Sequence, residues 1–180
     1  LEKVQALFDS WADSDRSERM AVGHERAARA ALAELNVLPG QHYLDIGCGN
    51  GYSVRWVAAQ HPSIQAIGID ASSQMVMKAR EMSGSLPNTR FIHAPFPLQL
   101  LKSEAFDAIL SVEVFYYLPR LNDALRDVRR LLKPGGRFAC VIDYYEENAE
   151  SHAWPERVGV DMNLMSESLW RAAFVLAGLK

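Results

Sequence analysis

The residues with the clearest chemical meaning form one short segment, Tyr43-Leu44-Asp45-Ile46-Gly47-Cys48-Gly49-Asn50-Gly51-Tyr52. The segment predicts a strand that runs into three alternating glycines and then into a helix. Glycines suit such a turn because the chain takes unusual φ values there and because a ligand lies against bare backbone. The carboxylate of Asp45 would repel a phosphate and suits a ligand with an ammonium or sulfonium group. We therefore interpret the segment as a ligand-binding loop.

A dinucleotide-binding loop is the first alternative for this segment. The pattern G-x-G-x-x-G requires a glycine at position 52, where this chain has Tyr52. The third glycine, Gly51, comes one residue too early to bring a pyrophosphate close to the helix N-terminus. A nicotinamide-dependent oxidoreductase is thus the weaker alternative.

A second carboxylate, Asp70, ends the next apolar segment, about 20 residues further along the chain. An acid at this spacing, at the tip of a neighbouring strand, accepts hydrogen bonds from both ribose hydroxyls in nucleoside-binding α/β folds. Asp70 could instead cap the following helix, but Ser72 or Ser73 is also suited to that role. The spacing therefore favours a ligand that contains adenosine.

Short apolar segments alternate with segments of helical periodicity from Gln41 onward, which predicts a parallel sheet with helices on both faces. The predicted strands are 42–46, 64–69, 90–93, 106–111 and 137–143, and the predicted helices are 52–60, 72–82, 121–132 and 166–177. Right-handed crossovers give the strand order 3-2-1-4-5. The predicted fold class is α/β: a three-layer, doubly wound, mainly parallel sheet formed by residues 39–180.

Two helices are predicted before the first strand. Apolar residues at Val4, Leu7, Phe8 and Trp11 share a helical face, and residues 16–35 are rich in Ala, Glu and Arg. We interpret residues 1–38 as a helical cap within the same domain. Because the first helix is short, we expect the cap, with residues 144–165, to act as a mobile lid rather than as core.

The glycine loop closely resembles the first motif of class I S-adenosylmethionine-dependent methyltransferases, and Asp70 matches the acid that ends their second strand. Residues 105–113, Ala-Phe-Asp-Ala-Ile-Leu-Ser-Val-Glu, resemble the fourth-strand motif of this family. Residues 131–137, Leu-Leu-Lys-Pro-Gly-Gly-Arg, resemble the turn before its fifth strand. The resemblance covers residues 39–143 and implies a methyltransferase that uses S-adenosylmethionine and releases S-adenosylhomocysteine.

The resemblance also implies roles for individual residues toward this cofactor. Asp45 would lie near the amino group, and Asp70 would hold the ribose. The methionine part would lie along Gly47, Cys48, Gly49 and Gly51; the adenosine side would contact Ala71, Met75, Ala94 and Phe96; and Ser111, Val112 and Glu113 would border the transferable methyl group.

Two departures from the family pattern affect the site and the sheet. The acid that many members carry after the third strand is missing, so backbone around Ala94 and packing by Phe96 or Met75 would hold adenine; His93 fits a core role better than an adenine contact. The sequence given stops at Lys180, where two more strands are typical of the family. We therefore expect incomplete C-terminal strands, an open edge on the fifth strand, and a homodimer through that edge or a monomer of reduced stability.

The sequence contains three main candidates for a catalytic base, Glu113, Tyr116 and His152. None is required, because alignment of an already activated methyl donor with its acceptor supplies much of the rate. A lone loop histidine such as His152 is more often solvated than catalytic. Further ionisable residues beyond the strand ends are Tyr117, Asp143, Tyr144 and Tyr145.

Composition and charge limit the chemical class of methyl acceptor and the kinds of partner that we expect. The net charge is −3, with no basic stripe, so we expect a small-molecule acceptor and no nucleic acid. Neither an Asp/Asn-Pro-Pro-Tyr motif nor a Pro-Cys nucleophile occurs, which disfavours methylation of adenine or glutamine amino groups and of cytosine C5. The two cysteines, Cys48 and Cys140, lack ligand spacing, so no metal is expected.

The sequence also leads to expectations about the cellular location of the protein and about its function. No run of about 18 apolar residues occurs, so we expect a cytoplasmic protein without membrane contact. The predicted function is methyl transfer from S-adenosylmethionine to a small molecule. The nicotinamide-dependent oxidoreductase and a non-catalytic S-adenosylmethionine-binding subunit are the alternatives.

Overall fold

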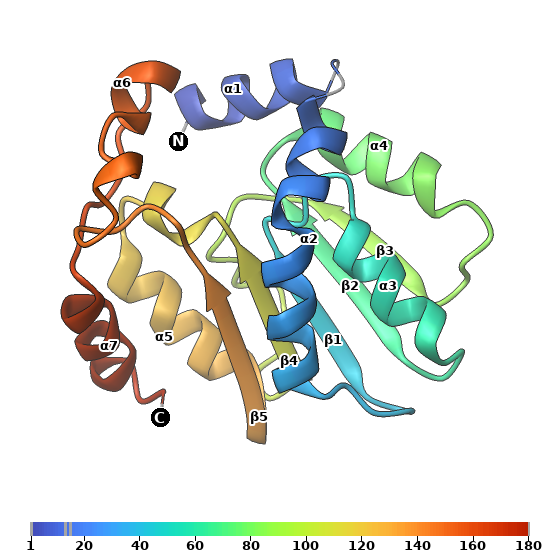
Figure 1. The fold of residues 1–180 in the computed structure, drawn as a ribbon. Coiled ribbons are helices and arrows are strands. Elements are labelled where there is room, and N and C mark those ends of the chain that lie inside the picture. The colour runs from blue at the N-terminus through green and yellow to red at the C-terminus, as the bar shows by residue number, and fades with distance from the viewer. Residues whose placement is uncertain (1, 13, 15, 180) are drawn as a thin grey trace.

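The structure is a computed structural model that describes residues 2–12, 14 and 16–179; residues 1, 13 and 15 of the predicted cap, and residue 180, lie outside this range. Figure 1 shows an α/β fold in which α1 lies across the carboxyl ends of the strands. The helices are α1 (Glu2–Ala12), α2 (Arg16–Leu35), α3 (Tyr52–Gln60), α4 (Ser73–Ser83), α5 (Leu121–Leu131), α6 (Trp154–Val158) and α7 (Glu167–Leu176), with 3-10 turns η1 (Phe115–Tyr117) and η2 (Ala149–Ser151).

The strands are β1 (His42–Ile46), β2 (Gln65–Asp70), β3 (Thr89–His93), β4 (Phe106–Val112) and β5 (Leu132–Val141). They form one parallel sheet in the order β3-β2-β1-β4-β5, which confirms the predicted order 3-2-1-4-5. Within the described residues β5 pairs with β4 alone, as expected for an open edge. The chain order changes direction between β1 and β4, and ligands of such sheets bind at that point.

Side chains of each buried strand alternate between two hydrophobic clusters, one on each face of the sheet. In β1, Tyr43 belongs to the cluster that α2, α3 and α4 cover. Leu44 and Ile46 point the other way, into the cluster under α5 and α7. The three predicted layers are therefore confirmed, and the side chains on both faces of β1 are buried.

The second helix corrects one prediction about the cap. Its residues Ala28, Leu32 and Leu35 are buried in the cluster beneath α2, because α2 packs along β4 and β5. The C-terminal half of α2 is therefore core and not lid. In α1, by contrast, Ala12 is the one buried residue among those described.

The start of the fifth strand also differs from the prediction. We predict it at residue 137 because residues 131–137 resemble the turn before the fifth strand of the methyltransferase family. In the structure β5 begins at Leu132, which pairs with Phe106, and the pairing shifts before Arg137 meets Ala108. The turn residues are thus an irregularity inside the strand. The short helix α6 also lies where we predict only a loop.

The crossover from β3 to β4, residues 94–105, is held by an ion pair of α5 rather than by a helix of its own. Arg130 donates from Nε to Asp127 Oδ1 at 2.6 Å and from Nη1 to the Leu101 carbonyl at 2.6 Å. Asp127 is 4% exposed and also accepts from Leu98 N at 3.3 Å.

No described helix is long and apolar enough to cross a membrane.

We predict that Arg130→Met lowers the free energy of unfolding by about 2 to 3 kcal/mol, because Asp127 is then a buried carboxylate without its charged partner. Arg126→Met is the matched control, since Arg126 forms the same i,i+3 pair with Asp123 on the exposed side of α5. That pair should contribute less than about 1 kcal/mol. Urea unfolding curves of both variants measure the difference, and equal losses would contradict it.

Candidate active site

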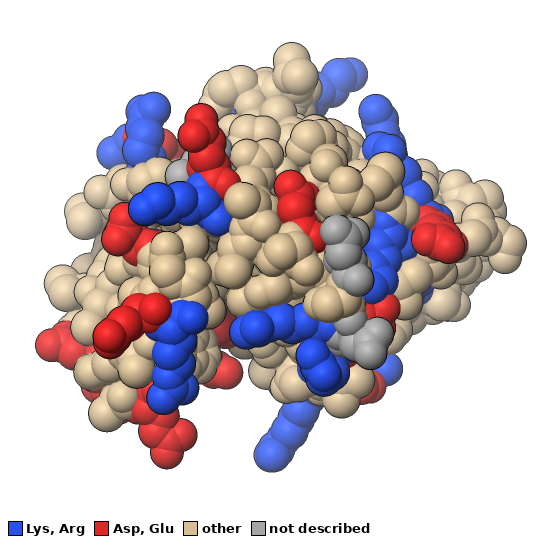
Figure 2. Space-filling model, turned by 90° about the horizontal axis from the view of Figure 1, so that it is seen from above, with Lys and Arg blue, Asp and Glu red and all other residues tan. Residues whose placement is uncertain are grey.

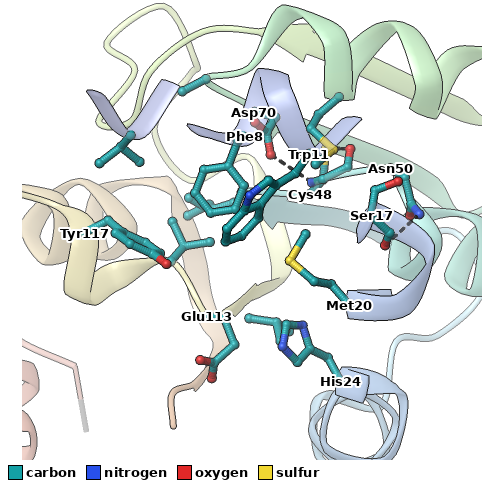
Figure 3. A pocket seen from close by; sticks show the side chains of 18 of the residues that line it. Phe8, Trp11, Ser17, Met20, His24, Cys48, Asn50, Asp70, Glu113 and Tyr117 are labelled. Atoms are coloured by element: carbon teal, nitrogen blue, oxygen red, sulfur yellow. Dashed lines mark hydrogen bonds between the residues drawn. The ribbon is translucent and has the colours of Figure 1, made fainter. Parts of the chain in front are cut away.

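A cavity of about 430 Å³ opens at the carboxyl ends of the strands, at the change of direction between β1 and β4. Its floor is formed by residues at and after the ends of β1, β2, β3 and β4, and its walls come from α1, α2 and α6. Figure 3 shows Phe8 and Trp11 of α1 and Met20 and His24 of α2 at the cavity. Ten of the residues predicted to bind cofactor line it: Gly47, Cys48, Gly49, Asp70, Ala71, Met75, Ala94, Phe96, Val112 and Glu113. The topology has thus collected residues from four strand ends around one space.

The glycine loop has the backbone that its sequence predicts. Gly47 and Cys48 donate from their backbone nitrogens to the Ile69 carbonyl at 2.8 and 3.0 Å, which ties the loop to β2. Gly51 has a φ of 77°, and a Cβ there would lie 2.6 Å from the Phe91 ring. Gly49 has a φ of 52°, and a Cβ there would meet no atom within 4 Å. Gly51 is therefore required for packing, whereas Gly49 faces open space.

Asp70, at the tip of β2, accepts two backbone hydrogen bonds. Oδ2 accepts from Gly49 N and Oδ1 accepts from Ser72 N, both at 2.8 Å. The helix cap is Ser72, whose Oγ accepts from Met75 N at 3.0 Å, so the capping role considered for Asp70 belongs to Ser72. Burial raises the pKa of Asp70, and the bonds from Ser72 and Gly49 oppose that shift. Each carboxylate oxygen keeps a lone pair for a ligand hydroxyl.

Three predicted cofactor residues lie behind the cavity wall instead of lining it: Asp45, Gly51 and Ser111. Asp45 is 3% exposed and accepts a hydrogen bond from Ser53 Oγ. Burial raises the pKa of Asp45 to about 7, partly opposed by the Ser53 hydroxyl. Ser111 donates to the Ile46 carbonyl at 2.8 Å, joining β4 to β1.

The catalytic candidates separate into two groups. Glu113 and Tyr116 both line the cavity, and the Tyr116 hydroxyl donates to Glu113 Oε2 at 2.8 Å. Burial raises the pKa of Glu113 to about 7, while the Tyr116 hydroxyl lowers it. His152 is exposed, pairs with the Glu146 carbonyl at 3.0 Å and does not line the cavity. Of the further ionisable residues, Tyr117 lines it, but Asp143, Tyr144 and Tyr145 do not.

Sequence reasoning placed the cap and residues 144–165 over the site as a lid, but it named few of the side chains with which α1, α2 and the segment that includes α6 line the cavity. The missed residues with large side chains include Phe8, Trp11, Met20, His24, Trp154 and Met162. Phe8 and Trp11 share the apolar face that the spacing predicts for the first helix, but that spacing does not tell a core from a cavity. Burial lowers the pKa of His24, which favours its neutral form.

The first helix is tied to the loop that carries Asp70. Gln5 Nε2 donates to the Ala71 carbonyl at 2.6 Å, and Ser72 Oγ donates to Asp9 Oδ1 at 2.5 Å. On its cavity side, Phe8 makes an edge contact with the Tyr117 ring, with centroids 5.5 Å apart. One short helix therefore bridges the β2 end and the β4 end of the cavity.

We predict that Asp45→Asn changes how stability depends on pH. The folded pKa of Asp45, about 7, exceeds the unfolded value of 3.8, so its contribution is fully present below about pH 4 and is lost as pH rises toward 7. The wild-type free energy of unfolding should therefore fall relative to the variant by about 4 kcal/mol between those limits. Urea unfolding at half-unit pH steps measures this, and parallel curves would show that Asp45 ionises normally.

Comparison with known proteins gives a consistent result. A family model described as a methyltransferase domain matches residues 44–140. Over 149 residues the chain is 31% identical to the O-methyltransferase resE of Aspergillus sclerotiorum, covering 79% of this chain and 56% of that protein. It is 30% identical over 150 residues to the demethylmenaquinone methyltransferase of Symbiobacterium thermophilum, covering 77% and 58%. The chain thus spans a little over half the length of these two curated relatives.

A solved structure is similar over a larger share of the chain. It is a complex of the Haloferax volcanii Trm112 methyltransferase activator with a protein assigned as a methyltransferase. The matched chain has a TM-score of 0.90 and 35% identity, and the alignment covers 95% of this chain and 75% of that one. The match over residues 44–140 includes the glycine loop, Asp70 and the fourth-strand motif. This chain belongs to the methyltransferase domain family and, within it, to the class I S-adenosylmethionine-dependent methyltransferases.

Proposed function

We propose that the chain transfers the methyl group of S-adenosylmethionine to a small-molecule acceptor. The observation that supports this most is the cavity in which the glycine loop and Asp70 adjoin aromatic side chains from α1, η1 and α6. When bound, the cofactor supplies an activated methyl group on a sulfonium. The protein's contribution is then to align the acceptor and to exclude water.

The residues of the β1 and β2 ends fit this cofactor. Asp70 offers two carboxylate oxygens that the backbone already holds, which suits a pair of ribose hydroxyls. The open space over Gly49 leaves backbone accessible to the methionine part. Adenine would pack between Met75 and Phe96, both of which line the cavity.

A small acceptor also agrees with the charge distribution. Figure 2 shows basic and acidic side chains interspersed on the face above the cavity, with uncharged surface between them. A polyanion would meet no continuous positive field on that face. The family match removes the support for the nicotinamide-dependent alternative.

A subunit that needs an activator is the second candidate function. It is favoured by the 35% identical structure, which was solved with the Trm112 methyltransferase activator. Calorimetry with S-adenosylmethionine, S-adenosylhomocysteine and NAD tests the shared first step, and tight binding of NAD alone would refute both candidates. Transfer of a labelled methyl group to a small-molecule pool, with and without a Trm112 protein, then separates them.

We predict that Asp70→Ala weakens S-adenosylhomocysteine binding about 10- to 150-fold, because two charge-assisted hydrogen bonds to the ribose are lost. Asp123→Ala is the control, since it removes a carboxylate that pairs with Arg126 far from the glycine loop. Calorimetry measures both affinities. Normal affinity in Asp70→Ala would mean that the ribose lies elsewhere.

We predict that S-adenosylhomocysteine slows amide exchange in α1. The helix is bonded to Ala71 and Ser72, directly after the proposed ribose carboxylate, so occupancy of that site should hold α1 closed. Exchange in α7, which covers a different part of the sheet, serves as the internal control. Hydrogen–deuterium exchange mass spectrometry measures these rates. If the amide exchange rates of α1 are the same with and without the ligand, the interpretation of α1 as a lid is wrong.

A further inference from the structure

The cavity has a second half, beyond the proposed cofactor residues, whose walls are mainly apolar and aromatic. Phe8 lies edge-on to Trp11, with centroids 5.0 Å apart, and edge-on to Tyr117 at 5.5 Å. Trp154 and Met162 contribute from the segment that includes α6. Rigid rings and adaptable methionine side chains favour a flat apolar molecule over a polar one.

Glu113 is a buried carboxyl in this half with an unmet hydrogen-bonding capacity. Glu113 is 7% exposed. Its Oε2 accepts from the Tyr116 hydroxyl at 2.8 Å, and its Oε1 is buried with no hydrogen-bond partner. Its φ of 59° lies in the left-handed region, which is uncommon for a residue other than glycine. Backbone strain and an unpaired buried acceptor both disfavour the fold, and such features concentrate at functional sites.

The charged groups of the cavity restrict the kind of acceptor that can bind beside Glu113. Arg16 and Arg157 line the same cavity and would repel a cationic acceptor. An ammonium group would also need several acceptors, and Glu113 has one free oxygen. The two arginines would attract an anionic acceptor, but its charge would be repelled at the Glu113 carboxylate, where the reacting atom must lie. A neutral hydroxyl needs one acceptor and meets none of these obstacles.

We propose that the methyl acceptor is a neutral, ring-bearing alcohol or phenol, and that the carboxylate of Glu113 accepts its hydroxyl proton. This inference rests on the proposed methyltransferase function and assigns its acceptor class and its base. As the new O–C bond forms, the C–S bond of the donor breaks and its electron pair stays on sulfur. S-adenosylhomocysteine remains, and the proton passes to the carboxylate.

The surroundings of Glu113 suit this role. Tyr116 holds the carboxyl through Oε2, while Oε1 is covered and has no hydrogen-bond partner, so a turn of the carboxyl toward the cavity that Glu113 lines would bring it to the acceptor. A base is most effective when its pKa lies near the working pH, and the pKa of Glu113 is about 7. The ionisable groups that influence Glu113, or are influenced by it, are Tyr116 and Tyr117 of η1, Tyr52 of α3, and Cys140 and Asp143 from β5 and the residues after it.

The test compares three probes of one shape, 2-naphthol, naphthalene and 2-naphthoate, on the full chain saturated with S-adenosylhomocysteine. We expect 2-naphthol to bind at least about tenfold more tightly than either of the others, as one hydrogen bond to a charged group allows. Glu113→Met should abolish that preference. Glu113→Gln keeps an acceptor oxygen and should bind 2-naphthol within about threefold of wild type, but methylate it at least about 100-fold more slowly.

Glu104→Gln is the matched control, because Glu104 is a second glutamate with positive φ and is exposed. It should change neither binding nor turnover. Unchanged preference for 2-naphthol in Glu113→Met, tighter binding of 2-naphthoate, or no binding of 2-naphthol would each overturn the inference. A chain that fails to bind S-adenosylhomocysteine at the start would instead refute the methyltransferase function, and circular dichroism of each variant shows whether it is folded.

Discussion

The carboxylate of Asp70 is the constraint on which the rest of the site depends. Its two oxygens join the loop after β1, through Gly49, to the loop after β2, through Ser72. Ser72 in turn caps α4 and bonds to Asp9 of α1. One half-buried acid therefore sets the shape of the glycine loop, the start of a helix and the position of α1, and each of its oxygens keeps a lone pair for a ligand.

Most of the architecture could be predicted from the sequence because its signals are local. The glycines at 47, 49 and 51 require φ values that other residues rarely adopt. Alternating apolar and helical segments predict a parallel sheet, and right-handed crossovers predict its strand order. Predicted helix ends such as Tyr52 and Gln60 agree with the structure. The start of β5 is harder to predict, because a pair such as Gly135-Gly136 occurs both in turns and in irregular strands. Composition alone does not distinguish the two.

The sequence predicts that the cap and residues 144–165 form a lid, but it could not identify which of their side chains line the cavity, because those residues meet only through tertiary packing. Phe8 and Met20 come from two helices that precede the first strand, whereas Trp154 lies beyond the last one. Their spacing along the chain carries no sign of a shared wall. The pairing of Glu113 with Tyr116 is closer in sequence, but it depends on the 3-10 turn η1, which follows an unusual backbone conformation at Glu113.

The bridge that α1 makes across the cavity has a consequence for turnover. Its bonds to Ala71 and Ser72 lie beside the proposed ribose site, and its Phe8 ring lies against Tyr117 in the acceptor half. Under the proposed function, spent cofactor and methylated product would leave past the same helix, and breaking both sets of contacts would widen their path. In enzymes with such lids, opening is often slower than chemistry. The strength of these few contacts would then set the maximal rate of the enzyme. Weakening them would speed product release but would also weaken the hold on cofactor and acceptor before the reaction.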